Sequence, residues 1–143
     1  MIIYADTSAL ISWFHPADPF AESLTKWCRD KQPEFCWNLF LRAELRHNLR
    51  RLSGKYAAIA WHSYRASESG KRLRLDTHAL SEYFDWADEV SGRHAPASAA
   101  GTWDFFHVAA AQQLQVEVFV TCDEAQADLA KTVGMRRVHL VRQ

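Results

Sequence analysis

Two short apolar runs near the two ends of the chain constrain the fold more than any other feature. Residues 2–5 and 116–121 are mostly apolar and rich in β-branched side chains, and each run leads to an acid, Asp6 or Asp123. Strands without regular polar alternation are typical of a parallel sheet that is buried on both faces. Ligands of such sheets bind beyond the carboxyl ends of the strands, so both acids acquire a functional interpretation.

Asp6 has a structural interpretation as well. Asp6, Thr7 and Ser8 are all residue types that cap helices, and they stand directly before the apolar residues 9–11. This segment alone favours a helix cap as strongly as a functional acid. Whether other acids arrive at similar places decides between the two interpretations.

Between the two runs, apolar residues recur mainly at helical spacing, and Asn38 and Thr102 are suited to cap helices. Gly54 and Gly134 stand where helices would end. The pattern predicts a three-layer α/β/α domain over residues 1–143, with a central, mainly parallel sheet of four to five strands. We expect helices over residues 21–31, 39–53, 55–69, 78–90, 103–115 and 124–133, further strands over 34–37 and 137–141, and an extended link over 71–75.

Composition narrows the class of protein. The 143 residues are 48% hydrophobic, which is enough for one buried core, and 17 basic and 17 acidic residues leave no net charge that would indicate or exclude nucleic acid. Cys28, Cys36 and Cys122 lack the paired spacing of a disulfide framework or a zinc site. The first residues do not have the pattern of a signal peptide, and no run approaches the ~20 apolar residues that span a bilayer. We therefore expect a cytoplasmic protein with reduced cysteines and no membrane contact.

Two further acids complete a candidate constellation. Glu44 lies at the border of the apolar stripe of the helix expected at 39–53, and Asp104 lies in the first turn of the helix expected at 103–115. Together with Asp6 and Asp123 they would repel one another by roughly 1–4 kcal/mol per close pair, so a cation is required. Carboxylate oxygens select Mg²⁺ or Mn²⁺ when no His/Cys ligand set is present. The implied chemistry is metal-assisted attack of water on a phosphodiester.

The same residues carry a resemblance to a known family. The segments YADTSAL, RAELRHNL, TWDFFHVAAA and VTCDEAQADLAKTVG, in this order, resemble the PIN domain, above all the VapC-type toxins of bacterial toxin–antitoxin systems. The resemblance covers the whole chain, and it implies a small α/β domain whose four acids bind Mg²⁺ or Mn²⁺ and cleave RNA. The positions that match those acids are Asp6, Glu44, Asp104 and Asp123, and the supporting hydroxyls match Thr7 or Ser8 and Thr121.

What the resemblance implies is an endoribonuclease toxin with an antitoxin protein as its partner. The alternatives are a housekeeping PIN nuclease and a non-catalytic PIN-like domain that binds a protein or RNA. Glu124 directly follows Asp123, which leaves open which of the two faces the metal. Other doubly wound classes fit poorly: a dehalogenase-type phosphatase needs the pattern DxDxT, where residues 6–10 read DTSAL, and a receiver domain needs an acidic pair and a later lysine.

Some residues have two interpretations. His107, one turn after Asp104, is expected to be a core histidine and not a catalytic residue. One group of basic residues forms either solvated surface or a track for an RNA backbone: Arg42, Arg46 and Arg50, with Lys71, Arg72 and Arg74. Six tryptophans and eight phenylalanines exceed what one small core readily hides, which predicts a homodimer that buries Trp61, Tyr64 or Trp86.

Overall fold

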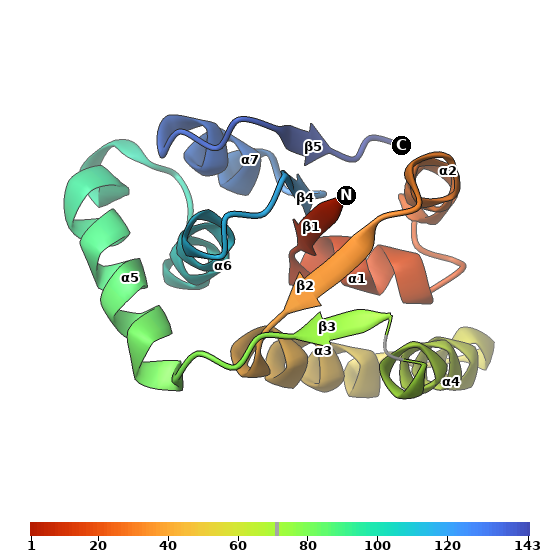
Figure 1. The fold of residues 1–143 in the computed structure, drawn as a ribbon. Coiled ribbons are helices and arrows are strands. Elements are labelled where there is room, and N and C mark those ends of the chain that lie inside the picture. The colour runs from red at the N-terminus through yellow and green to blue at the C-terminus, as the bar shows by residue number, and fades with distance from the viewer. Residues whose placement is uncertain (71) are drawn as a thin grey trace.

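A five-stranded, entirely parallel sheet forms the centre of the protein (Figure 1). The computed structural model describes residues 1–70 and 72–143. The strands lie in the order β3-β2-β1-β4-β5, so the first strand is central. The predicted α/β architecture is confirmed. The strands are β1 (Ile2–Ala5), β2 (Glu34–Trp37), β3 (Leu73–Leu75), β4 (Val118–Thr121) and β5 (Val138–Leu140).

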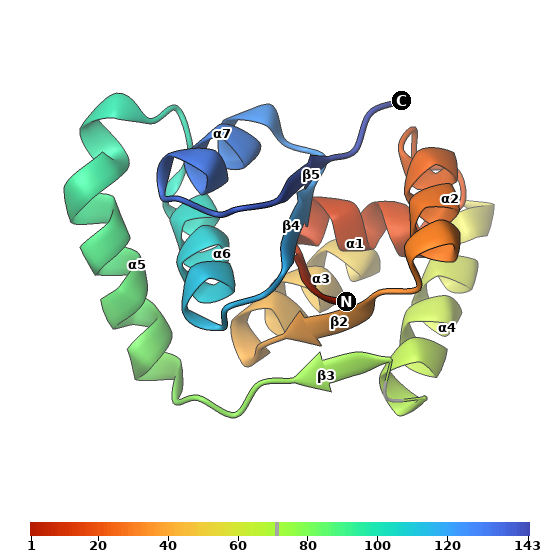
Figure 2. The ribbon, with the colours of Figure 1, turned by 45° about the horizontal axis from the view of Figure 1, so that its top comes forward.

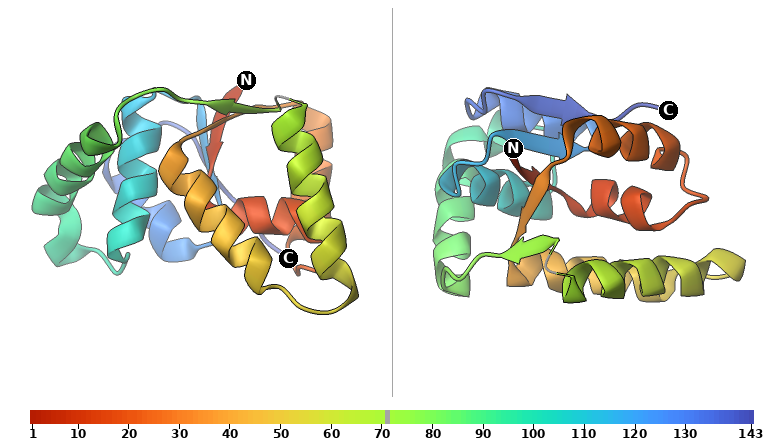
Figure 3. Two further views of the ribbon diagram at one scale, coloured as in Figure 1. Left: turned by 90° about the horizontal axis from the view of Figure 1, so that it is seen from below. Right: turned by 45° about the vertical axis from the view of Figure 1, so that its right-hand side comes forward.

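Helices cover both faces of this sheet. Helices α1 to α4 pack on one another on one side, and α5 packs on α6, which in turn packs on α7, on the other (Figures 2 and 3). None of the helices in the described ranges is long and apolar enough to cross a bilayer. The helices are α1 (Thr7–Phe14), α2 (Ala21–Lys31), α3 (Leu39–Arg51), α4 (Lys55–Ser69), α5 (Leu80–His94), α6 (Thr102–Gln113) and α7 (Glu124–Thr132), with a 3-10 turn at Ala95–Ala97.

The core lies on both sides of the two central strands. Ile3, Tyr4 and Phe119 are fully buried, and the rings of Tyr4 and Phe119 stack with their centroids 6.1 Å apart. On α3, Leu41 and Leu45 are also fully buried, as the apolar stripe of this helix predicts. Burying each such leucine contributes roughly 1.5–3 kcal/mol. These leucines make α3 part of the common core, where it packs on α1 and α4.

The parallel register aligns the carboxyl ends of the strands at one edge. Ala5 pairs with Val120, and the Asp6 amide donates a hydrogen bond of 3.0 Å to the Val120 carbonyl. The residues that follow β1, β2 and β4 therefore emerge beside one another. Two of them, Asp6 and Asn38, cap the next helix, with side chains that accept from the Ala9 and Leu41 amides at 2.8 Å.

Three local predictions were wrong. Residues 73–75 form the edge strand β3, because Leu73 pairs with Phe35; Lys71, which begins the expected link, lies outside the described residues. Gly54 does not end α3 but stands directly before α4 as its N-cap. Its φ is +77°, a value that glycine readily adopts. Thr102 is already helical and Gly101 is the N-cap, because Asp104 binds the Gly101 amide at 2.7 Å.

Candidate active site

Asp6 is the most buried of the candidate acids, at 2% exposure. Its carboxylate accepts hydrogen bonds from Ser8 Oγ at 2.8 and 2.9 Å, the Ala9 amide at 2.8 Å and Thr121 Oγ1 at 2.7 Å. Burial raises the pKa of Asp6, while the nearby His107 and these hydrogen bonds partly offset the rise. Ser8 and Thr121 therefore lie where the resemblance to the PIN domain places supporting hydroxyls. Asp6 is both a helix cap and a candidate functional acid.

Glu44 reaches the same edge from α3. Its Oε2 accepts a hydrogen bond from Thr7 Oγ1 and lies 2.7 Å from Nε2 of His107 on α6. Burial alone would raise the pKa of Glu44, but the interactions with His107 and Thr7 outweigh it and lower the pKa overall. Thr7 follows Asp6 directly, so Glu44 and Asp6 are brought to the same place.

Asp104 and Asp123 form the outer part of the site. Asp104 Oδ2 accepts from the Gly101 amide, and its Oδ1 accepts from Gln126 Nε2 at 2.7 Å. Asp123 caps α7 by accepting from the Gln126 amide at 2.9 Å, and its own amide donates to Thr121 Oγ1 at 2.9 Å. Gln126 thus connects the two outer acids, and Thr121 connects Asp123 to Asp6.

The four acids are linked, but they do not form a closed ligand cluster. In residues 1–70 and 72–143, no three His, Cys, Asp or Glu side chains come close enough together to hold a metal ion. The same part of the chain contains no ion pair between a lysine or arginine and Asp6, Glu44 or Asp104. The site is therefore a set of spaced oxygen donors whose negative charge no lysine or arginine of the described residues neutralises.

These donors fit a hydrated divalent cation. Mg²⁺ usually retains several waters and binds through only one or two carboxylates, so a spaced set suits it better than a closed cage. Gln126 Oε1, on the amide that holds Asp104, is buried and has no hydrogen-bond partner among the residues that the structure describes, so it can accept from such a water. All of the candidate ligands are hard oxygen atoms, the type that Mg²⁺ and Mn²⁺ prefer.

The arginine stripe of α3 is occupied by other contacts. Arg42 Nε and Arg46 Nη2 both bind Glu68 at 2.9 Å, and Arg50 lies over the ring of Trp61, 5.0 Å from its centroid. These contacts join α3 to α4. The structure therefore favours a structural role for this stripe over a track for RNA.

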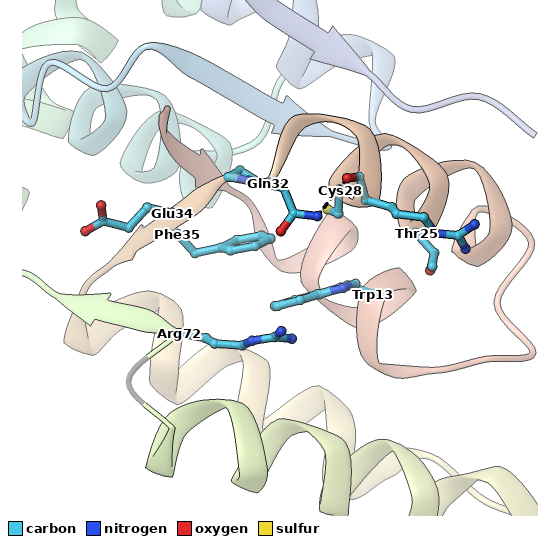
Figure 4. A pocket seen from close by; sticks show the side chains of 9 residues that line it. Trp13, Thr25, Cys28, Gln32, Glu34, Phe35 and Arg72 are labelled. Carbon is cyan, nitrogen blue, oxygen red and sulfur yellow. Dashed lines mark hydrogen bonds between the residues drawn. The ribbon is translucent and has the colours of Figure 1, made fainter.

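A separate cavity of about 400 Å³ lies at the opposite edge of the sheet (Figure 4). It opens where β2 and β3 begin, and Figure 4 shows Trp13, Phe35 and Arg72 facing it. The rings of Trp13 and Phe35 stack at 4.3 Å. Because the candidate acids lie at the carboxyl edge, this cavity is not the candidate active site.

Two further residues of this region, His107 and Gln126, stand at positions that the sequence marks. His107 is indeed a buried core histidine, at 2% exposure, but it also contacts Glu44. Its position one helical turn after Asp104 was visible in the sequence. Gln126 stands three residues after Asp123, which is the spacing of a capping-box partner at the start of a helix.

Sequence comparison places the chain in a family. A family model of the PIN domain matches residues 3–132, nearly the whole chain, so the protein belongs to the PIN domain family. No curated protein matched the chain. The recognised resemblance is thereby confirmed at the level of the family.

Solved structures show the same fold in VapC-type toxins. VapC20 of Mycobacterium tuberculosis, described as a sarcin–ricin loop cleaving toxin, has 17% identity and a TM-score of 0.71, covering 93% of this chain and 95% of its own. VapBC2 of Rickettsia felis, solved with a promoter DNA fragment, has 13% identity and a TM-score of 0.71, covering 99% and 100%. FitAcB of Neisseria gonorrhoeae has 15% identity and a TM-score of 0.60, covering 96% of each chain. At these identities the likeness establishes the fold.

Proposed function

We propose that this PIN domain protein, residues 1–143 as one domain, is a Mg²⁺- or Mn²⁺-dependent endoribonuclease and the toxin of a toxin–antitoxin system. The observation that carries the proposal is Asp6, a buried carboxylate at the end of the central strand with Glu44 beside it and no ion pair to a lysine or arginine of residues 1–70 and 72–143. Burying such a charge is costly, and a bound cation would offset the cost. The fold shared with VapC20 and VapBC2 supports the same assignment.

In this proposal Asp6, Glu44, Asp104 and Asp123 would surround the cation at the carboxyl edge, one or two of them in direct contact and the others through its waters. When bound, the cation would lower the pKa of an attacking water and offset charge on the phosphate. Ser8 and Thr121 hold the Asp6 carboxylate by hydroxyl donation, and Thr7 does the same for Glu44. Gln126 fixes Asp104 against rotation. The side chains thus present their oxygen atoms in fixed orientations before the substrate arrives.

The test uses purified protein and single-stranded and hairpin RNAs, including a sarcin–ricin loop hairpin because VapC20 is described as cleaving that loop. We expect cleavage with Mg²⁺ or Mn²⁺ and none in excess chelator. Cleavage that continues unchanged in chelator would contradict the metal requirement. Metal-dependent binding of RNA without cleavage would instead support the non-catalytic alternative. Growth arrest on expression in the cytoplasm of a bacterium would distinguish a toxin from a housekeeping nuclease.

We propose an antitoxin as the protein partner, supported by the toxin–antitoxin assemblies among the similar structures. The unneutralised carboxylates fit an arginine, whose guanidinium pairs with carboxylates through two parallel hydrogen bonds. We expect a disordered tail of the antitoxin to place an Arg or Lys between Asp6, Glu44 and Asp104. Binding of a synthetic tail from the protein encoded directly upstream should weaken as Mg²⁺ is raised. An affinity that does not respond to Mg²⁺ would contradict this competition.

We also propose a homodimer, with exposed aromatic residues of α5 and α6 in its interface in place of Tyr64. Tyr64 is fully buried and cannot lie in an interface, whereas Phe84 and Trp103, on α5 and α6, are 49% and 52% exposed. Phe84→Glu should shift the mass measured by light scattering from dimer to monomer. Ile59→Glu, on α4, is the control, because Ile59 is equally exposed at 52%. A monomeric wild-type protein at micromolar concentration would contradict the proposal.

A further inference from the structure

A buried chain of hydrogen bonds runs beneath the candidate acids. Asn38 Nδ2 lies 3.3 Å from Tyr4 Oη, Tyr4 Oη lies 3.0 Å from His107 Nδ1, and His107 Nε2 lies 2.7 Å from Glu44 Oε2. The first three of these residues are at most 2% exposed. A polar chain this deeply buried is stable only if each donor faces an acceptor.

The order of donors in this chain follows from its two ends. The Asn38 Oδ1 atom accepts from the Leu41 amide, so the Asn38 amide group donates to Tyr4 Oη. Because Tyr4 Oη accepts from Asn38, its own hydroxyl hydrogen is left to be donated to the other neighbour, His107 Nδ1. His107 then carries its hydrogen on Nε2 and donates it to the Glu44 carboxylate. Every polar group in the chain is satisfied in this arrangement.

This chain of hydrogen bonds joins the three elements that carry Asp6, Glu44 and Asp104. Tyr4 lies on β1 two residues before Asp6, Asn38 caps α3, which carries Glu44, and His107 lies on α6 one turn after Asp104. The ring of Phe40 packs on His107, 5.3 Å between centroids, and closes this region to solvent. A single network therefore connects the backbones from which the three carboxylates project.

We propose that His107 is the positioning residue of Glu44: it holds the Glu44 carboxylate in a metal-binding orientation, and Tyr4 and Asn38 fix the His107 tautomer that does so. The proposal rests on the metal-dependent function proposed above and assigns a role to a residue outside its ligand set. Partners that orient a metal ligand typically change metal affinity by about 10–100-fold when they are removed.

The test measures Mn²⁺ affinity by calorimetry, without RNA. His107→Phe should weaken Mn²⁺ binding about 10–100-fold, while His107→Gln, which can still donate to Glu44 and accept from Tyr4, should retain most of the affinity. The decisive variant is the pair His107→Phe/Glu44→Gln. If His107 acts through Glu44, the pair binds Mn²⁺ as weakly as Glu44→Gln alone, whereas a purely structural role gives additive losses.

A second pair of variants keeps the proposal testable if His107→Phe fails to fold. Tyr4→Phe removes one buried hydroxyl from the chain, and it should weaken Mn²⁺ binding. Tyr64→Phe is the matched control, because Tyr64 is equally buried but its hydroxyl binds Arg46 at 2.6 Å. Equal losses of Mn²⁺ affinity in the two variants would overturn the positioning role.

A metal-free measurement separates this inference from the proposed function. Long-range proton–nitrogen spectra of the metal-free protein should show His107 protonated at Nε2 and not at Nδ1, and Tyr4→Phe should mix the two tautomers. If the wild type binds no Mn²⁺ but shows this tautomer pattern, the metal-dependent function fails while the hydrogen-bond arrangement stands. An Nδ1-protonated His107 would overturn the inference itself.

Discussion

The inner and outer acids of the site are stabilised in different ways. The inner pair, Asp6 and Glu44, accepts hydrogen bonds from side-chain hydroxyl and imidazole groups. The outer pair, Asp104 and Asp123, accepts hydrogen bonds from backbone amides at helix starts. Capping a helix is sufficient reason for an acid to stand at the outer positions. Glu44 caps nothing, and Asp6 is more deeply buried than its capping role requires. The inner pair therefore carries the stronger indication of function.

The largest expected effect comes from the inner pair. Asp6→Asn should lower RNA cleavage by about 10²–10³-fold, the size of loss seen for a fixed electrostatic group. The same change should raise the thermal midpoint by a few degrees, because a buried charge is removed while Ser8 and Thr121 can rotate their hydroxyls to suit the amide. Cleavage and differential scanning calorimetry on the same preparation measure both. If Asp6→Asn lost activity and was also less stable than the wild type, the inner acids would not differ from the outer acids in how they are stabilised.

Asp123 tests whether an outer acid contributes more than a cap. Asp123→Ala should cost roughly 0.5–2 kcal/mol of stability, the usual effect of losing an N-cap, whereas Asp123→Asn keeps a good cap and should be neutral. Urea denaturation measures this difference. If Asp123→Asn still lowers cleavage about tenfold or more, the charge of Asp123 has a role apart from capping, and the corresponding change at Glu124 then shows which of the two faces the metal.

Gln126 provides a smaller effect on the outer pair. Gln126→Met keeps the buried volume but removes the donor to Asp104, and it also removes the unpartnered Oε1 atom. We expect cleavage to fall by less than about tenfold, since orienting groups act only through the residue that they hold. Stability should change little, because one hydrogen bond and one unsatisfied oxygen disappear together. Activity equal to that of the wild type would show that Asp104 does not depend on Gln126.

The two inner acids should respond to pH with opposite signs. The pKa of Asp6 is raised from its ordinary 3.8, so the unfolded chain ionises first and stability is lost as pH rises between 3.8 and the raised value. The pKa of Glu44 is lowered from 4.5, so its contribution is present above 4.5 and lost as pH falls through the lowered value. With rising pH, Asp6→Asn should therefore become increasingly stabilising and Glu44→Gln increasingly destabilising, each relative to the wild type. Urea denaturation from about pH 3 to pH 7 measures both.

Most of the architecture followed from the sequence because it depends on local patterns. The apolar runs that became β1 and β4 and the stripe of α3 were visible in short segments, and Asn38 was recognisable as a cap. The strand β3 was not visible in the sequence. It is only three residues long and lies in a basic segment, and it becomes a strand only through its pairing with β2. Gly54 was assigned to the wrong helix because a positive φ serves equally well at either end of a short loop.

The site was predictable in part and for a different reason. Acids at strand ends and helix starts can be located from the sequence, and the structure places Asp6, Asp104 and Asp123 at such positions. Glu44 was inferred from its place at the edge of the α3 stripe, and the functional role of all four acids stays a prediction. Their connections could not be predicted, because they depend on contacts between distant residues, such as His107 with Glu44 across 63 positions. The ion pairs of Arg42 and Arg46 on α3 were not predictable for the same reason, because their partner Glu68 lies on another helix, α4.

The central place of the first strand has a consequence for biosynthesis. The Asp6 carboxylate is held by Thr121, 115 positions further along the chain, and β1 can pair with β4 only when that segment has left the ribosome. Pairings of such long sequence separation form late, and chains are synthesised at about 5–20 residues per second. A truncated or nascent chain therefore contains Asp6 without the groups that hold it. The candidate site acquires its complete geometry only after residues 118–121 have left the ribosome.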